Sequence, residues 1–94
     1  MTYMLVRHKA EDYAKWKSVY DEHAPTRKAM GGKGSLLLAN ADNPNELLVL
    51  LEWDDLNKAR EFAGSQDLRE TMARAGVADV PDIYFCETLE RMPF

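Results

Sequence analysis

One apolar run constrains this chain more than any other feature. Residues 46–53 read ELLVLLEW, with no alternation of apolar and polar side chains over most of their length. A strand with one solvated face alternates, so a strand of this composition must be covered on both sides. Any fold proposed for the chain therefore has to supply two covers for the sheet that contains this strand.

The residues before this run predict a strand, a helix and a second strand. Residues 3–10 alternate, with Met4, Val6 and His8 on one face. Asp12 is a good N-cap for a helix that repeats aromatic residues at three- and four-residue spacing. Pro25 predicts a break and then a short helix to about residue 30, ended by two glycines. Residues 35–41 predict the next strand, followed by a turn over residues 42–45.

The residues after the run predict a helical segment and a final strand. Two aspartates cap a helix that Gly64 and Ser65 interrupt, and the apolar pattern resumes until Gly76. Residues 83–92 then predict a fourth strand that is longer than the others. The single cysteine, Cys86, falls in this strand, and we expect it to be buried and inert.

This order of elements, βαββαβ, predicts an α+β domain of the ferredoxin-like type over residues 1–94. Right-handed crossovers give a four-stranded antiparallel sheet with the helices on one face. No segment remains to cover the other face, although residues 46–53 require it. The simplest cover is a second copy of the chain, so we expect a homodimer formed through the sheet face.

Composition argues against several classes of partner. The formal net charge is −4, and the twelve basic residues are scattered. Nucleic-acid binding favours a clustered positive surface, so we expect none. No stretch approaches the roughly 18 apolar residues of a membrane span, and the first residues lack the pattern of a signal peptide. We therefore expect a cytoplasmic protein with no membrane partner.

Several short motifs, taken together, resemble those of a known group of proteins. They are Val6-Arg7-His8, Asp12-Tyr13-x-x-Trp16, Leu51-Glu52-Trp53-Asp54, Ala59-x-x-Phe62 and Asp67-Leu68. The chain resembles the dimeric α/β-barrel superfamily, and most closely its antibiotic biosynthesis monooxygenase (ABM)-like domains. The resemblance implies two sheets packed face to face as a barrel, and an apolar cavity between each sheet and its helices.

The resemblance also implies a choice of chemistry. ABM-like oxygenases oxidise polycyclic phenols to quinones without metal or flavin, whereas related proteins are cyclases or haem degraders. Trp53 matches the tryptophan position of the haem degraders, but residues 68–76 contain no histidine to ligate iron. We therefore expect no cofactor.

Two histidines are the candidates for polar chemistry. His8 shares a face with Met4 and Val6, where an imidazole is either a general base or phenol-orienting group, or a core histidine satisfied by a neighbour. We assign His8 and Trp53 as the catalytic candidates. His23 lies either at a cavity mouth or at a helix C-terminus, where the dipole stabilises it. Two histidines without a carboxylate or cysteine at ligand spacing make a weak metal site, and we expect no metal.

Aromatic residues with polar edges suit a pocket for a flat, partly polar ligand, although the same spacing is typical of a plain core. We assign six residues to such a pocket: Tyr13, Trp16, Tyr20, His23, Phe62 and Tyr84.

The sequence supports two functions. The first is a cofactor-independent monooxygenase or cyclase acting on a small aromatic, polyketide-like molecule. The alternative is a non-catalytic dimeric module that binds an apolar metabolite or a partner protein. An open cavity with His8 free to face a ligand favours the first, and a cavity filled by its own side chains with His8 held in place favours the second.

Overall fold

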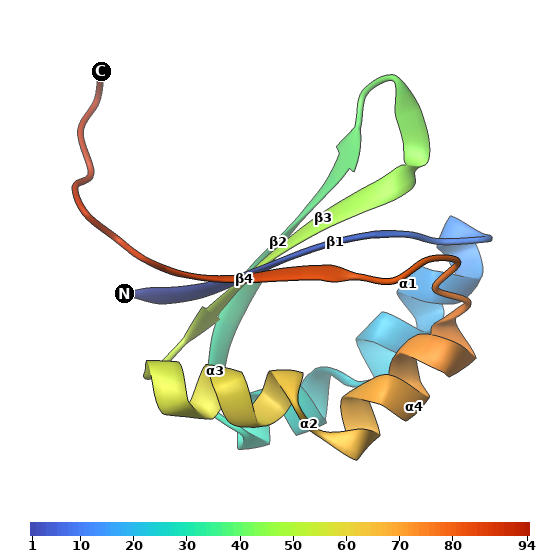
Figure 1. The fold of residues 1–94 in the computed structure, drawn as a ribbon, viewed down its shortest axis with the longest axis horizontal. Helices are drawn as coiled ribbons and strands as arrows, with labels where there is room; N and C mark the ends of the chain where they lie inside the picture. Colours follow the sequence, from blue (N-terminus) through green and yellow to red (C-terminus); the bar gives the residue numbers. More distant parts are fainter.

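A computed structural model describes residues 1–94 and shows one sheet with helices along one of its faces (Figure 1). Four strands and four helices follow one another in the order β1 Thr2–Lys9, α1 Tyr13–Glu22, α2 Ala24–Ala29, β2 Gly32–Asn40, β3 Asn43–Trp53, α3 Leu56–Ala63, α4 Gln66–Ala75 and β4 Asp82–Glu87. The strands are antiparallel in the order β2-β3-β1-β4. The predicted ferredoxin-like α+β fold is confirmed. None of the helices combines the length and the apolar character that crossing a membrane requires.

The helix ends lie where the local sequence places them. The carboxylates of Asp12 and Asp55 and the hydroxyl of Ser65 accept hydrogen bonds from backbone N–H groups in the first turns of α1, α3 and α4. Pro25 occupies the first turn of α2, where its missing N–H costs nothing. Gly76 ends α4 at φ +76°, in the left-handed region that glycine adopts without a steric penalty.

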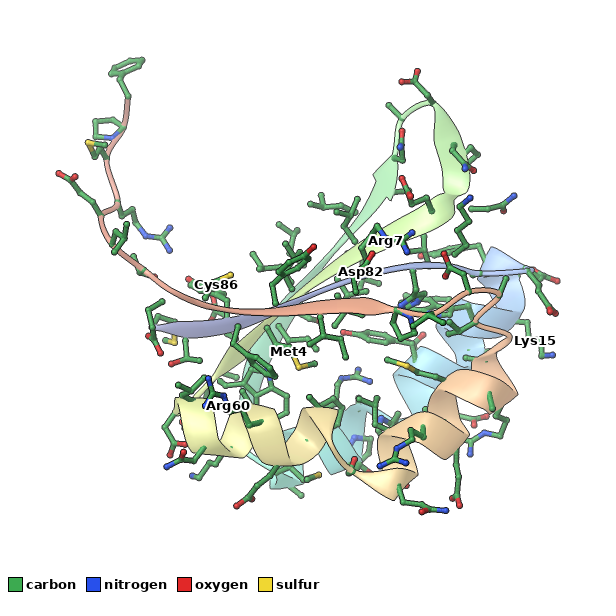
Figure 2. The ribbon with its side chains drawn as sticks, in the orientation of Figure 1. Met4, Arg7, Lys15, Arg60, Asp82 and Cys86 are labelled. Atoms are coloured by element: carbon green, nitrogen blue, oxygen red, sulfur yellow. The ribbon has the colours of Figure 1, made fainter.

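The core lies between the sheet and the helices. Alternate residues of the two central strands are buried there, led by Met4 and Val6 of β1 and by Val49 and Trp53 of β3. Figure 2 shows Met4 pointing toward the helices, while Arg7 and Cys86 lie on the other side of the sheet. The alternation of β1 was predicted, and it decides which side chains reach the site.

The other face of the sheet is uncovered in the single chain. Its central cross-strand row, read from β2 to β4, is Leu36, Leu50, Leu5 and Tyr84. Leu36 is 53% exposed and Tyr84 is 57% exposed. In the next row Arg7 forms ion pairs with Glu46, Asp79 and Asp82. The face is thus an apolar band with one ion-pair cluster beside it.

Two expectations about β4 were wrong. The strand ends at Glu87 rather than Met92. Glu87 pairs with Thr2 as the last pair of the β1–β4 ladder, and beyond it only the backbone N–H of Thr88 bonds back, to the carbonyl oxygen of Met1. Residues 88–94 instead rise away from the helices (Figure 1), with Leu89 and Phe94 fully exposed. Cys86 is exposed rather than buried, because it lies opposite Tyr3 on the uncovered face.

Candidate functional site

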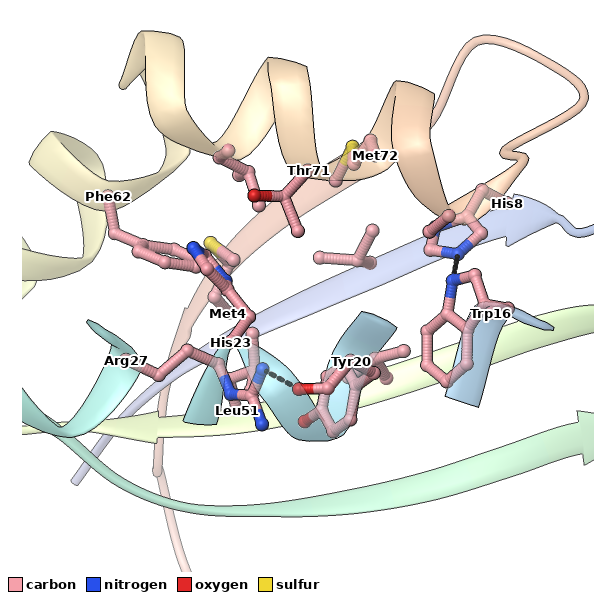
Figure 3. A pocket seen from close by; sticks show the side chains of 14 residues that line it. Met4, His8, Trp16, Tyr20, His23, Arg27, Leu51, Phe62, Thr71 and Met72 are labelled. Carbon is pink, nitrogen blue, oxygen red and sulfur yellow. Dashed lines mark hydrogen bonds between the residues drawn. The ribbon is translucent and has the colours of Figure 1, made fainter. Parts of the chain in front are cut away.

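A pocket lies between the inner face of the sheet and the helices (Figure 3). Its volume is about 470 Å³ including the open mouth, but the inner part has room for only a few water molecules. Most of its walls are apolar. The lining residues are Met4, Val6 and His8 of β1, Val49 and Leu51 of β3, Trp16 and Tyr20 of α1, His23, Arg27 of α2, Phe62 of α3, and Leu68, Thr71, Met72 and Ala75 of α4.

His8 and Trp16 form a buried hydrogen bond at one end of this pocket (Figure 3). The indole Nε1–H of Trp16 donates to Nε2 of His8 at 2.8 Å. Trp16 is 4% exposed and His8 is 2% exposed. An indole nitrogen only donates, so Nε2 of His8 carries the lone pair and Nδ1 carries the proton. Nδ1 is buried and has no hydrogen-bond partner in the protein. Burial lowers the pKa of His8, which favours this neutral form.

His23 lies at the junction of α1 and α2, away from His8. Its Nε2 is hydrogen-bonded to the carboxylate of Asp67 in the first turn of α4. A carboxylate only accepts, so Nε2 carries a proton and a neutral His23 keeps its lone pair on Nδ1. The ring packs beside Phe62 with the centroids 5.8 Å apart. His23 therefore has the arrangement of a base that an acidic group orients.

An aromatic stack continues from Trp16 and ends in a cation. Trp16 and Tyr20 stack with ring centroids 4.9 Å apart, and the guanidinium carbon of Arg27 lies 3.6 Å from the centroid of Tyr20. Nη1 of Arg27 donates to the backbone carbonyl oxygen of Tyr20 at 2.7 Å. The hydroxyl of Tyr20 is buried without a partner. Burial lowers the pKa of Arg27, although a guanidinium stays charged at any physiological pH.

Five of the residues assigned from the sequence line this pocket: His8, Trp16, Tyr20, His23 and Phe62. The other three do not line it: the catalytic candidate Trp53, and Tyr13 and Tyr84, which were assigned to the pocket. Trp53 is fully buried behind Phe62, with the ring centroids 4.9 Å apart. Tyr13 is 45% exposed and lies over a separate hollow with Leu37 and Leu47, because it begins α1 outside the core.

Tyr84 belongs to the uncovered face, opposite Leu5. The side chains of β4 alternate across the sheet, and Ile83 and Phe85 take the inner positions.

Sequence reasoning missed Arg27, Thr71 and Met72 as lining residues. A signal for Arg27 was present, because it follows His23 by four residues and helical spacing puts such residues on one face. Met72 was marked by the apolar pattern that resumes before Gly76, because Leu68, Met72 and Ala75 recur at helical spacing. Nothing comparable marked Thr71, because its position depends on how α4 packs against the sheet.

The titratable side chains nowhere gather as a metal site would require: no group of three or more His, Cys, Asp or Glu is arranged to hold an ion. The residues that α4 presents to the pocket also include no histidine. The polar groups that do face the pocket are donors and one candidate base.

The fold is that of the antibiotic biosynthesis monooxygenase domains. A proposed monooxygenase of this kind from Bordetella bronchiseptica superposes with a TM-score of 0.80 at 14% identity, covering 95% of this chain and 97% of that chain. SnoaB, a cofactor-independent oxygenase from Streptomyces nogalater, gives a TM-score of 0.76 at 15% identity, covering 99% and 96%. No protein-family model and no curated protein matches the sequence.

Proposed function

We propose that this protein is a cofactor-independent monooxygenase for a small phenolic or anthrone-like aromatic molecule. The observation that carries the proposal is the apolar pocket into which His8, Tyr20 and Arg27 bring polar groups, two of them with buried atoms that lack partners. Buried polar atoms are normally hydrogen-bonded, so unpartnered ones beside a cavity suit a ligand that supplies the missing bonds. The similarity of the fold to SnoaB supports the same class of reaction.

The reaction balances without a metal or an organic cofactor. Removal of a proton from the phenol or from the activated ring CH₂ leaves an anion that gives one electron to O₂. The substrate radical and superoxide then combine, and loss of water converts CH₂ to C=O. The sum is substrate CH₂ plus O₂ giving C=O plus H₂O. The oxygen molecule supplies both the new carbonyl oxygen and the oxygen of the water.

In this proposal the two histidines have different tasks. The sequence left His8 open as a general base, as a phenol-orienting group or as a core histidine satisfied by a neighbour, and its Nε2 lone pair accepts from Trp16. Its free Nδ1–H is a donor, suited to hold the oxygen of a substrate anion. His23, oriented by Asp67, is the candidate base. Trp53 lies behind Phe62 and keeps that ring in place rather than touching the substrate.

Oxygen consumption tests the proposal. Wild-type protein with dithranol, an anthrone that carries two phenolic groups, should take up one O₂ per quinone formed, above the spontaneous rate. His23→Gln should lose most of this rate, because base catalysis contributes roughly 10²–10⁴-fold. His8→Gln should retain part of it. A rate equal to the protein-free background refutes the proposal.

A non-catalytic binding module is the second candidate. The narrow inner pocket and the engaged Nε2 of His8 favour it. Binding of an aromatic ligand without oxygen uptake in the same experiment would support it.

A homodimer formed through the sheet face is part of the proposal. The apolar row around Leu50 can pack against the same row of a second copy, because the two sides of a two-fold interface are the same surface. The rising tail extends the same side of the sheet, where Arg91 donates to the hydroxyl of Tyr3. Burying this row and the exposed Leu89 would remove apolar side chains from water.

A further inference from the structure

The ion pairs of the two partly buried arginines, Arg7 and Arg27, differ sharply. Arg7 meets three carboxylates, Glu46, Asp79 and Asp82, at 2.8–3.1 Å. Arg27, which lines the pocket, lies within 4.0 Å of no carboxylate, since the ion pairs of the protein all involve other cations. Asp21 acts on the charge of Arg27 only at longer range, and its oxygens are bonded to Lys17. The pocket therefore has a positive charge that the protein leaves unbalanced.

The bonds that Arg27 does make leave one edge of its guanidinium free. Nη1 donates to the Tyr20 carbonyl oxygen, and the flat face lies over the Tyr20 ring. Nε and Nη2 have no partner in the protein, and these two groups form the edge that binds both oxygens of a carboxylate side by side. Arg27 is partly buried, and even partial removal of a charge from water without a counter-charge is unfavourable, so an anion on the ligand would supply the missing partner.

The other end of the pocket offers a neutral hydrogen-bond donor that lacks an acceptor. His8 presents an Nδ1–H that nothing accepts, and Figure 3 places His8 and Arg27 at opposite ends with Tyr20 between them. The walls between the ends are apolar, from Val6 and Leu51 on the sheet to Phe62 and Met72 on the helices. A complementary ligand is a flat apolar body with an anion at one end and an acceptor oxygen at the other.

We propose that the substrate or ligand of this pocket is an aromatic carboxylic acid whose carboxylate binds the Nε–Nη2 edge of Arg27 while a hydroxyl or carbonyl oxygen at its far end accepts from His8. This inference rests on the proposed function for the identity of the site, and it adds the chemical class of the molecule. Arg27 is then a specificity-determining residue, because it separates acids from neutral aromatic molecules of the same shape.

A matched pair of probes tests the inference. Isothermal titration calorimetry compares 6-hydroxy-2-naphthoate, whose carboxylate and hydroxyl lie at opposite ends of the rings, with 2-naphthol, which has the same rings and hydroxyl without the carboxylate. Wild-type protein should bind the acid about tenfold or more tightly, the factor expected for one charge-assisted hydrogen-bonding contact. Arg27→Gln should abolish this preference by weakening only the acid, and Arg27→Lys should restore part of it, because a lysine keeps the charge but not the planar edge.

Arg60→Gln is the control, because it removes the same charge from α3 at a residue that does not line the pocket. It should leave the preference unchanged. Equal binding of the two probes by wild-type protein overturns the inference, as does a preference that survives in Arg27→Gln. The wild-type comparison tests the ligand class even where a variant fails to fold, and Arg27→Lys then tests the part played by Arg27.

The outcomes for the ligand class and for the oxygenase are separable, because calorimetry requires no turnover. A carboxylate preference without oxygen uptake supports the ligand class and refutes the oxygenase. Oxidation of dithranol without a carboxylate preference supports the oxygenase and overturns the ligand class.

Discussion

The hydrogen bond between Trp16 and His8 makes a quantitative prediction about stability. Both side chains are buried, and the two nitrogen atoms are 2.8 Å apart. Trp16→Phe removes the donor and leaves Nε2 of His8 buried without a partner. His8→Leu removes the acceptor and leaves the indole N–H of Trp16 buried without a partner. Each stranded group should cost about 1–3 kcal/mol of unfolding free energy. Trp16→Phe should cost roughly 1–2 kcal/mol more through lost packing.

The double variant separates the hydrogen bond from the packing. It strands neither group, so it should be more stable than the sum of the single changes predicts, by about 1–2 kcal/mol. For a domain of this size, 1 kcal/mol corresponds to a melting-temperature difference of roughly 4–8 °C.

Urea unfolding of the four proteins measures this coupling. Far-UV circular dichroism reports on all four, and fluorescence of the fully buried Trp53 reports independently where Trp16 is absent. All samples need the same chain concentration, because association shifts apparent stability. A coupling energy below about 0.5 kcal/mol would mean that the bond contributes no more than independent sites do, and the role assigned to His8 would be wrong.

Three further predictions concern pH, association and a helix end. Because burial lowers the pKa of His8, the unfolded chain takes up a proton below about pH 6.5 that the folded chain excludes, so stability should fall from pH 6.5 to 5 by at most about 1.4 kcal/mol per unit. Urea titrations of His8→Leu should lack that component, and an equal slope in both proteins would contradict it. Leu50→Glu should convert a dimer to a monomer in analytical ultracentrifugation at micromolar concentration, whereas Ala73→Glu on an exposed part of α4 should not, and a monomeric wild type would refute the interface. Gly76→Ala should cost about 1 kcal/mol or more in thermal unfolding because φ is +76°, and an unchanged melting temperature would show that the helix end relaxes.

Much of the site depended on packing that no local pattern encodes. The period of two in β1 was enough to put His8 on the inner face with Met4 and Val6. The same pattern did not predict the hydrogen bond from the indole of Trp16, because that indole reaches His8 only when α1 packs over β1. The contact with Trp16, which is tertiary, therefore decides that His8 presents a donor rather than a base.

The alternation, the capping residues and the prolines and glycines of this sequence were sufficient to determine the order of strands and helices and the face that each β1 side chain takes, because these follow from residues near in sequence. The ferredoxin-like sheet was predicted from that order and the right-handed crossover rule, although its strand pairs join residues far apart in the chain. Tertiary structure alone decided that β4 stops at Glu87, where β1 offers no further partner, and that Trp53 lies behind Phe62. It also decided that Arg27 enters the pocket with a free edge. These outcomes depend on atoms distant in the chain, whose meeting is set by the packing of whole elements.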